Sequence, residues 1–538
     1  MKKLLLGNEA LAQAAIDAGI SGVYAYPGTP STEITTYIQN SPIAKELKIH
    51  SNWSVNEKTA MEAALGMSYA GKRSMTVMKH VGLNVAADVF MNMSVSGING
   101  GLVVVVADDP SMHSSQNEQD SRYYGKFALI PILEPSNQQE AYDITKHAFL
   151  LSEKTGLPIM VRMVTRLSHS RSGVETGKRE LQNNINLSKN PHQFQLIPVH
   201  ARNRYQHLID IQTNSRENSE NSNFNKFIDG SNKSMGIIAA GIAFNYVMEN
   251  FEDGNCPYPI LKISQYPLPK RKVKQLFDTC EKILVLEDGY PFIEELVSDF
   301  LGENKKVIGR LSGHLNRVGE LNPDNISKAL GFTQIKPKEI PNIVTARPPE
   351  LCVGCGHRDL FNAINELGKE NNDQKVFGDI GCYALGVLPP FNSINTLIDM
   401  GASITMAKGA SDAGIHPAIA IIGDSTFTHS GMTGLLEAVV ENTKMTVIIS
   451  DNSAIAMTGA QDSSASGRLV TICKGIGVDP EHLKVLTPLH KNLEENIELI
   501  RNEINYDGVS VIISQRPCVQ LSKEKKDNIK HLLEIAIN

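Results

Sequence analysis

The chain has 538 residues, of which 41% are hydrophobic and 20% charged, and its formal net charge is -6. At roughly 100–200 residues per domain, this length and composition are typical of a globular protein with three or four domains. The weak negative charge argues against a general nucleic-acid binder, and no run of about 18 apolar residues predicts a membrane span. Because Asn8, Glu9 and Gln13 interrupt the short apolar start, a cytoplasmic protein is expected rather than an exported one.

Residues 1–175 alternate helical patterns with short apolar strands. Helices are predicted at 10–20, 58–71 and 139–156. Strands are predicted at 22–26, 74–79, 101–110 and 157–164. This alternation is typical of a mostly parallel sheet with helices on both faces.

Residues 176–234 differ from this pattern, because they are rich in Asn and Ser. A linker with a solvated helix is expected there. A shorter α/β unit follows at 235–335, where three apolar runs predict strands, at 234–241, 260–265 and 282–289. A proline-containing connector at 336–350 then leads to the last unit.

The last unit, residues 336–538, repeats the alternation. Helices are predicted at 360–370, 404–414 and 431–443. Strands are predicted at 375–381, 416–425, 445–453 and 508–517. The first and last units are similar in style, which fits a duplicated fold, and we predict an α/β protein with three doubly wound parallel-sheet domains.

The stretch IAIIGDSTFTHSG, residues 419–431, places Asp424 directly after a buried strand, and Asn452 ends the next strand. Ligands of open parallel sheets bind beyond the carboxyl ends of the strands. Carboxylate and amide oxygens suit Mg²⁺, and Gly423 permits close approach of a phosphate. This spacing resembles the thiamine-diphosphate signature, although Gly-Asp-Ser also occurs as a simple turn with a helix cap.

Thiamine diphosphate also needs a carboxylate from a different domain to activate its aminopyrimidine ring. Glu57, in WSVNEKTAMEAALG, lies where a strand or loop turns into a helix. An isolated glutamate at this place is explained by the helix dipole alone. Together with the signature in the last unit, we interpret Glu57 as the candidate activating acid.

Four of the seven cysteines form a possible ligand set. The odd number of cysteines and the absence of an export signal make a disulfide framework unexpected. A Cys-x-x-Cys pair is followed by two cysteines at predicted strand ends, and the set is Cys352, Cys355, Cys382 and Cys518. Four thiolates could hold a [4Fe–4S] cluster or a structural zinc, or they could be unliganded core cysteines.

Several longer motifs carry a resemblance to a known family. They include YPGTPSTEI, NWSVNEKTAMEAALG, ADDPSMHSSQNEQDSR, RPPELCVGCGHR and GDIGCYALG. Over residues 1–520 the chain resembles the alpha subunits of indolepyruvate:ferredoxin oxidoreductases, in the 2-oxoacid:ferredoxin oxidoreductase superfamily. The resemblance implies a pyrimidine-binding domain at 1–175, a linker at 176–234, a transketolase-C-like domain at 235–335 and a diphosphate-binding domain at 336–538.

The resemblance assigns roles to individual residues. Glu57 matches the cofactor-activating glutamate, and Asp424 and Asn452 match the Mg²⁺ ligands, with the carbonyl of Ala454 as a third. The residues implied to contact the cofactor are Gly423, Ser425, His357 and Leu385. The residues implied near the substrate are Thr29, His80 and the stretch 113–117, which could instead be a polar loop held by its own hydrogen bonds. Cys352, Cys355, Cys382 and Cys518 match the proximal-cluster cysteines.

The implied reaction is oxidative decarboxylation of an aryl 2-oxo acid with coenzyme A, giving an aryl-acetyl-CoA, carbon dioxide and reduced ferredoxin. The implied partners are a smaller beta subunit, a second copy of the chain in a homodimeric core, and ferredoxin or another low-potential acceptor. No nucleic acid or membrane partner is expected.

Two departures from the family pattern leave alternatives open. Typical alpha subunits continue into a ferredoxin-like tail, whereas this sequence ends at Asn538 without such a cysteine run, so the electron acceptor is open. The motif CVGCGH also differs from the CPGCPH typical of the indolepyruvate subfamily. The alternatives are a non-oxidative thiamine-dependent 2-oxo acid decarboxylase and a non-catalytic scaffold subunit.

Overall fold

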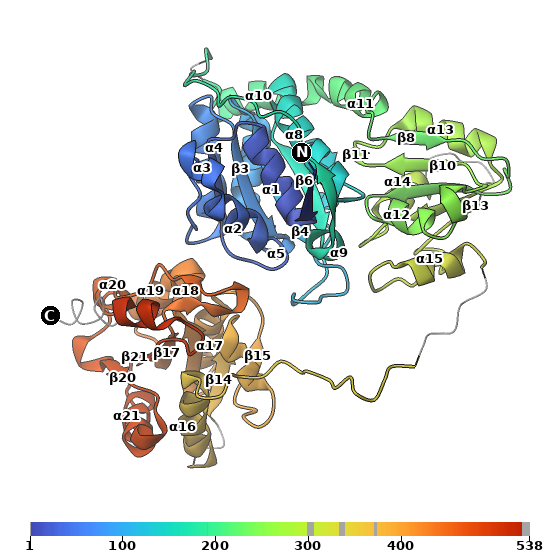
Figure 1. Cartoon of the computed structure of the whole chain (residues 1–538). Coiled ribbons are helices and arrows are strands. Elements are labelled where there is room, and N and C mark those ends of the chain that lie inside the picture. The colour runs from blue at the N-terminus through green and yellow to red at the C-terminus, as the bar shows by residue number, and fades with distance from the viewer. Residues whose placement is uncertain (1, 191, 299–305, 333–338, 371–373, 530–538) are drawn as a thin grey trace. The chain divides into compact units, whose positions relative to one another are not determined.

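The computed structural model describes residues 2–190, 192–298, 306–332, 339–370 and 374–529. Contacts divide the chain into two units, which we call the first unit, residues 1–338, and the second unit, residues 339–538. Figure 1 shows the course of the chain through them. Each unit combines mostly parallel β-sheets with helices, in agreement with the predicted α/β fold class.

The first unit begins with a six-stranded sheet of strand order β11-β5-β6-β4-β3-β2. Its strands are β2 (Gly22–Ala25), β3 (Ser74–Lys79), β4 (Leu102–Asp108), β5 (Ile132–Leu133), β6 (Ile159–Val164) and β11 (Gln265–Tyr266). All neighbours are parallel except β11, which is antiparallel to β5. The four long strands match the predicted ones within a few residues.

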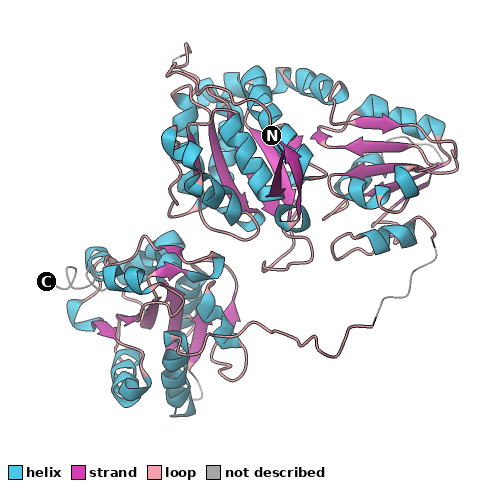
Figure 2. Ribbon diagram, in the orientation of Figure 1, coloured by secondary structure: helices cyan, strands magenta, loops and turns pink. Residues whose placement is uncertain are grey.

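Helices cover both faces of this sheet (Figure 2). One face packs on α4 (Glu57–Tyr69), α5 (His80–Val85) and α6 (Ala87–Ser96), through a core that includes Val104 and Val106. The other face packs on α1 (Gly7–Asp17), α2 (Thr32–Asn40) and α8 (Gln138–Thr155), through a core that includes Val103 and Val105. Strand β4 is therefore apolar at every position from 102 to 107, as expected for a strand buried on both faces.

Three strands of this region have no counterpart in the prediction, whereas the helices between 176 and 234 agree with the helix expected there. Strand β1 (Lys2–Leu6) pairs antiparallel with β7 (Arg171–Glu175). Between 176 and 234 the chain forms α10 (Pro198–Asp210), α11 (Gln212–Glu220) and β8 (Lys226–Ile228). The last of these elements is already an edge strand of the next sheet.

The second sheet of the first unit has the order β13-β12-β9-β10-β8. Its other strands are β9 (Gly236–Ala240), β10 (Ile260–Ile263), β12 (Lys282–Leu286) and β13 (Lys306–Ile308). Its helices are α12 (Ala243–Met248), α13 (Lys270–Thr279), α14 (Phe292–Ser298) and α15 (Pro323–Ala329). The strands β9, β10 and β12 coincide with the predicted runs.

A buried network of charges ties the two sheets of the first unit together. Arg162 donates to Asp108 Oδ2 at 2.6 Å, to Glu134 Oε1 at 2.5 Å and to the carbonyl of Asp288 at 2.8 Å. Arg122, paired with Asp120, also contacts Glu287 at 2.9 Å. Both guanidinium groups are fully buried. Removing one partner of such a network leaves an uncompensated buried charge, at a cost of about 3–5 kcal/mol.

The second unit holds a six-stranded parallel sheet of order β15-β14-β16-β17-β21-β20. Its strands are β14 (Lys375–Gly378), β15 (Thr396–Leu397), β16 (Ala418–Gly423), β17 (Met445–Asp451), β20 (Leu483–Leu486) and β21 (Val509–Gln515). Its main helices are α16 (Gly356–Glu370), α17 (Ala402–Asp412), α19 (Met432–Val440), α20 (Leu469–Ile476) and α21 (Leu493–Ile504). Cores on both faces again bury the strands.

Within the described residues, no helix has the length and apolar character needed to cross a membrane. The predicted boundaries at 175, 234 and 335 are not tested by the contacts that define the two units. They stay a prediction.

Candidate functional site

The second unit carries buried carboxylates at the carboxyl ends of neighbouring strands, which we call the acidic edge: Asp379, Asp424 and Asp451. Strands β16 and β17 are paired with Gly423 opposite Ser450, so the next residues, Asp424 and Asp451, lie at adjacent strand ends. Asp424 and Asp451 are each 2% exposed. The fold thus concentrates negative charge where an open parallel sheet binds its ligand.

Asp424 is held in an unfavourable environment for an anion. Burial, reinforced by the charge of Asp451 and only partly opposed by a hydrogen bond from Ser463, raises the pKa of Asp424 to about 8. Among the described residues, its Oδ2 atom is buried and has no hydrogen-bond partner. A buried carboxylate oxygen without a donor is a position that a cation would satisfy.

Asp451 and Asp379, in contrast, are tied to the protein. Asp451 accepts hydrogen bonds from Gln515 Nε2 at 2.9 Å and from the N–H of Ser453 at 2.9 Å. Asp379 accepts the N–H groups of Gly401 and Ser403 at 2.9 and 3.1 Å, which fixes the start of α17. These two carboxylates shape the edge, whereas Asp424 keeps an unused acceptor.

Asn452 follows β17 directly and is partly exposed. Its Oδ1 atom accepts the N–H of Ala454 at 3.1 Å, and its carbonyl accepts the N–H of Cys518 at 2.9 Å. An amide oxygen has two lone pairs, so Asn452 retains acceptor capacity. The two predicted Mg²⁺ side chains therefore end adjacent strands, with Ala454 two residues further on.

Packing against Tyr383 requires a glycine at position 423. A Cβ atom at this position would lie 2.6 Å from the ring of Tyr383. That ring donates its hydroxyl to the carbonyl of Ile380, which also accepts from Thr426. Ser425, which follows, is partly exposed.

Beside the acidic edge lies a cavity of about 110 Å³ that brings the four predicted cysteines together. Residues of the candidate site form much of its wall, namely Cys352, Cys355, Cys382, Cys518, His357, Leu385, Asp451 and Asn452. Burial, followed by the nearby thiols of Cys518, Cys355 and Cys352, raises the pKa of Cys382 to about 12. Sequence positions up to 166 residues apart thus converge on one pocket.

Neighbouring polar groups contact these thiols. Cys355 Sγ lies 3.2 Å from His357 Nδ1, and Gln520 Nε2 donates to Cys352 Sγ at 3.4 Å. Burial lowers the pKa of His357 to about 4, so its ring is neutral at pH 7. In the described part of the chain, no three His, Cys, Asp or Glu side chains are arranged as a metal site. The choice between cluster, zinc and free thiols is not made by this geometry.

In the first unit, Glu57 opens helix α4 behind the N-cap residue Asn56. It is 5% exposed and packs against α5, where a Cβ on Gly82 would lie 2.5 Å from Glu57 Oε1. Lys79, at the end of β3, is close enough for Glu57 and Asp109 to oppose the lowering of its pKa by burial. The predicted activating acid is therefore buried beside the carboxyl end of the sheet.

The other predicted residues of the first unit gather at the carboxyl ends of β2, β3 and β4. His80 is 1% exposed, burial lowers its pKa, and its Nε2 lies 3.2 Å from the carbonyl of Asn117. Ser114 Oγ donates to the carbonyl of Thr29 at 3.2 Å, while His113 pairs with Glu320. Contacts within the protein therefore hold His113, Ser114 and Asn117, and the role of the stretch 113–117 stays a prediction.

Sequence reasoning missed several residues of these sites. The sequence pattern assigns no role to Asp451, although its charge contributes most, after burial, to the raised pKa of Asp424. The pattern places Lys79 and Asp109 at the ends of predicted strands, although both flank the site. Polar residues at the ends of apolar runs were the available signal. Arg516 lines the cysteine cavity. No sequence pattern predicts this position, because only the tertiary structure brings Arg516 to the cavity.

Two protein families match separate parts of the chain. "Pyruvate flavodoxin/ferredoxin oxidoreductase, thiamine diP-bdg" matches residues 13–224. "Thiamine pyrophosphate enzyme, C-terminal TPP binding domain" matches residues 379–513. The first match contains Glu57, and the second contains Asp424 and Asn452.

Curated relatives match nearly the whole chain. Indolepyruvate oxidoreductase subunit IorA of Archaeoglobus fulgidus is 39% identical, over 97% of this chain and 87% of the relative. The subunit of the same name from Methanothermobacter thermautotrophicus is 38% identical, over 96% of this chain and 87% of the relative. The 2-oxoglutarate synthase subunit KorA of Methanocaldococcus jannaschii is 29% identical, over 32% of this chain and 48% of the relative.

A solved structure shares the fold. The 2-oxoglutarate:ferredoxin oxidoreductase from Magnetococcus marinus, with 2-oxoglutarate, coenzyme A and succinyl-CoA bound, aligns with a TM-score of 0.50 and 17% identity. The alignment covers 61% of this chain and 65% of that chain. This likeness confirms the predicted α/β fold.

Proposed function

The chain belongs to the family of the indolepyruvate oxidoreductase subunits IorA, and on this premise we propose that it carries out the oxidative decarboxylation of an aryl 2-oxo acid. The prediction of a thiamine-diphosphate-dependent 2-oxoacid:ferredoxin oxidoreductase subunit is confirmed by these relatives and by the two thiamine-binding families. The proposed products are an aryl-acetyl-CoA and carbon dioxide, with electrons passing to ferredoxin or another low-potential acceptor.

The observation that carries the proposal is the buried Oδ2 of Asp424 at the acidic edge, which has no hydrogen-bond partner within the described ranges. Asp424, Asn452 and the carbonyl of Ala454 would hold Mg²⁺, since all three offer the hard oxygen ligands that this ion prefers. The ion would neutralise Asp424 and attract the diphosphate of the cofactor. Gly423 and Ser425 would flank that diphosphate.

Thiamine diphosphate, when bound, supplies the nucleophilic carbon and the electron sink for decarboxylation. Glu57 would hold a proton at its carboxylate and exchange it with the cofactor's aminopyrimidine. His80 and Thr29 would border the substrate, and Leu385 the cofactor. We propose that Glu57 of one protomer and the acidic edge of a second copy serve the same cofactor, in a homodimeric core.

The four cysteines around one cavity favour an oxidative reaction over a simple decarboxylation. Cys352, Cys355, Cys382 and Cys518 would hold a [4Fe–4S] cluster, which four thiolates typically bind. The cationic Arg516 and the amide of Gln520 border the same cavity and would face the cluster's negative charge. A beta subunit, as the relatives' designation as subunits suggests, would complete the enzyme.

The test is anaerobic purification of the chain with its beta subunit, followed by iron and labile-sulfide analysis and by a panel of 2-oxo acids with a viologen dye. Cys352→Ser is expected to lower bound iron and dye reduction together. Cys256→Ser, a cysteine of the first unit, is the matched control. Aldehyde release without dye reduction would favour the non-oxidative decarboxylase, and an inability to bind thiamine diphosphate would favour a scaffold subunit.

A further inference from the structure

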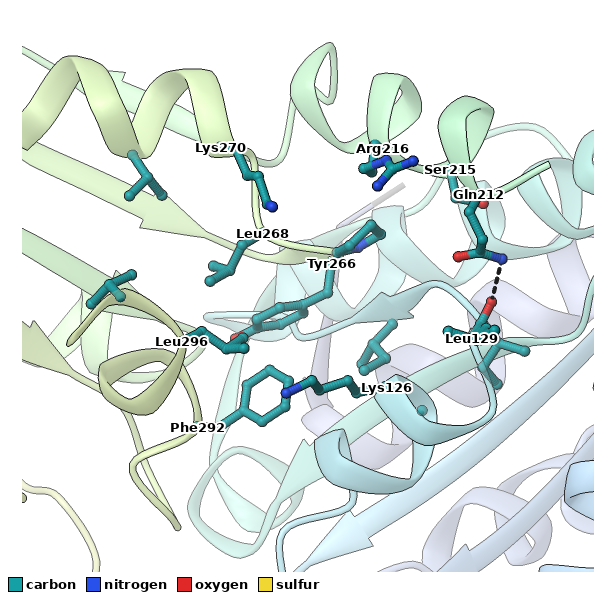
Figure 3. A pocket seen from close by; sticks show the side chains of 16 residues that line it. Lys126, Leu129, Gln212, Ser215, Arg216, Tyr266, Leu268, Lys270, Phe292 and Leu296 are labelled. Carbon is teal, nitrogen blue, oxygen red and sulfur yellow. Dashed lines mark hydrogen bonds between the residues drawn. The ribbon is translucent and has the colours of Figure 1, made fainter. Parts of the chain in front are cut away.

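The first unit contains a second cavity, of about 250 Å³, to which neither the candidate site nor the proposed reaction assigns a role. Three segments form its walls: the turn after α7 (Arg122–Phe127), the chain after β11, and helix α14, with α11 and α13 at the rim. Figure 3 shows these side chains around the space. None of the predicted site residues lines it.

The floor of this cavity is apolar and partly aromatic. Tyr266 and Phe292 stand edge to face, with ring centroids 5.7 Å apart, and Leu268 and Leu296 line the space beside them. The hydroxyl of Tyr266 donates a hydrogen bond to Glu134 at 2.8 Å, so this polar group is part of the buried charge network. The ring of Tyr266 remains as an apolar wall of the cavity. A dry apolar cavity of about 150 Å³ holds benzene, and this one has room for a bicyclic ring.

The rim has one sign of charge. Lys126, Arg216 and Lys270 line the cavity, and none of the described lining residues is acidic. Lys126 lies over the ring of Phe292, with Nζ 5.8 Å from the centroid. Three cations around an apolar space favour a ligand that combines a hydrophobic body with a negative group.

A buried polar atom gives a second, independent indication of a ligand. Ser215, on α11, lines the cavity and is 3% exposed, and its Oγ has no hydrogen-bond partner among the described residues. Buried hydroxyls are normally paired. Its neighbour Gln212, in contrast, donates to the carbonyl of Leu129 at 3.0 Å (Figure 3). An acceptor oxygen of a ligand would satisfy Ser215 and face Arg216 at once.

We propose that this cavity binds a small aromatic monocarboxylate, with the ring against Tyr266 and Phe292 and the carboxylate at Ser215 and Arg216. The described residues that line this site are different from those of either carboxyl edge, and the proposal does not depend on the proposed reaction. Through Tyr266 it adjoins the charge network that also holds Asp108 beside His80. An occupant would therefore contact Tyr266, whose hydroxyl is held by Arg122 and Glu134 of that network.

The test is calorimetric titration of the full chain, without thiamine diphosphate, using 2-naphthylacetate and its neutral analogue 2-naphthylethanol. We expect saturable binding of the acid and weaker binding of the alcohol. Arg216→Gln should weaken binding of the acid about threefold to fivefold, the effect of one partly solvated charge. Arg202→Gln, on the neighbouring helix α10, is the charge-matched control and should have no effect.

Two cavity-filling variants locate the binding. Leu296→Trp and Leu268→Trp lie on different elements and are only partly buried, so the fold should tolerate at least one of them. Either should reduce affinity at least about tenfold, because the ring loses its space. The proposal is wrong if the acid does not bind at millimolar concentration, if acid and alcohol bind equally, or if a folded filled variant binds as the wild type does.

Discussion

The aspartates at the carboxyl edges of the two units differ in their hydrogen bonding and in the direction in which their pKa values are shifted. In the first unit, Asp109 accepts hydrogen bonds from Thr165 Oγ1 and Ser115 Oγ, both at 2.7 Å, and from the N–H of Ser114 at 2.8 Å. Burial raises the pKa of Asp109, but these hydrogen bonds outweigh it and the net shift is downward. In the second unit, the pKa of Asp424 is raised to about 8, and one of its oxygens has no hydrogen-bond partner in the part of the chain that the structure describes.

We interpret Asp109 as a structural acid and Asp424 as the proposed ligand of a cation. Both residues follow a buried parallel strand, so position alone does not distinguish them. The two aspartates differ in the number of hydrogen-bond donors that the protein supplies to them. A carboxylate whose oxygens are all hydrogen-bonded is stabilised little by a cation, whereas a carboxylate with an unpaired oxygen gains the partner that it lacks.

The largest effect is expected from Asp424→Asn, compared with Asp109→Asn. Loss of the charge at Asp424 should weaken Mg²⁺-dependent binding of thiamine diphosphate by about 1,000-fold, several kcal/mol of metal interaction. Asp109→Asn should leave that binding nearly unchanged while loosening its loop. Titration calorimetry with and without Mg²⁺ measures the affinity of both variants for thiamine diphosphate. Equal losses of affinity in the two variants would contradict the proposed difference between Asp424 and Asp109.

Glu57→Gln tests the acid of the first unit. We expect the rate of dye reduction to fall about 100-fold, because a proton-exchanging group is lost, while binding of thiamine diphosphate changes far less. The two quantities are measured on the same preparation. A variant that turns over normally would remove Glu57 from the mechanism.

Asp288 provides a third aspartate for the comparison. Its buried Oδ2 has no hydrogen-bond partner among the residues described, but its Oδ1 lies 3.9 Å from a guanidinium nitrogen of Arg310. Burial raises its pKa to about 6. Because this native value exceeds the unfolded one, its contribution to stability is complete below pH 4 and is lost as the pH rises through 6. Relative to wild type, Asp288→Asn should therefore gain up to about 3 kcal/mol of stability over this window.

Thermal midpoints at pH 4, 5, 6 and 7 measure this gain. The difference between Asp288→Asn and wild type should grow in favour of the variant and then level off above pH 6. A difference that is constant with pH would show that Asp288 is already ionised in the folded protein.

The smallest effect is expected from a pair of glycine variants near Glu57. Gly82→Ala places a methyl group against the Glu57 carboxylate, and the displaced acid should cost about tenfold in rate. Gly66→Ala, on the same helix as Glu57, meets nothing within 4 Å and should stabilise the helix by about 0.5–1 kcal/mol without changing the rate. Steady-state rates and melting curves separate the two outcomes.

Much of the fold follows from patterns within the sequence. Apolar runs such as 102–107 locate the strands, and the polar residues after them locate the edges, so the juxtaposition of β16 and β17 could be anticipated. Two-residue strands such as β11 give no periodic signal, and neither does the pairing of β1 with β7. Two of the donors that separate Asp109 from Asp424, Ser114 and Ser115, follow it in the same loop, and the third, Thr165, comes from the start of α9 (Thr165–His169). Their sequence positions do not show that they point at Asp109, so only the folded chain reveals the difference. The roles of the site residues stay predictions.

The short strand β11 has a consequence for how the protein is made. It closes the outer edge of a sheet whose other strands are all complete by Val164, about 100 residues earlier in synthesis. Until Gln265 and Tyr266 leave the ribosome, β5 presents an open edge that a neighbouring nascent chain can pair with. A fragment of residues 1–175 lacks β11, so the edge of β5 would stay unpaired. This fragment should therefore be prone to aggregate even though most of its core is present.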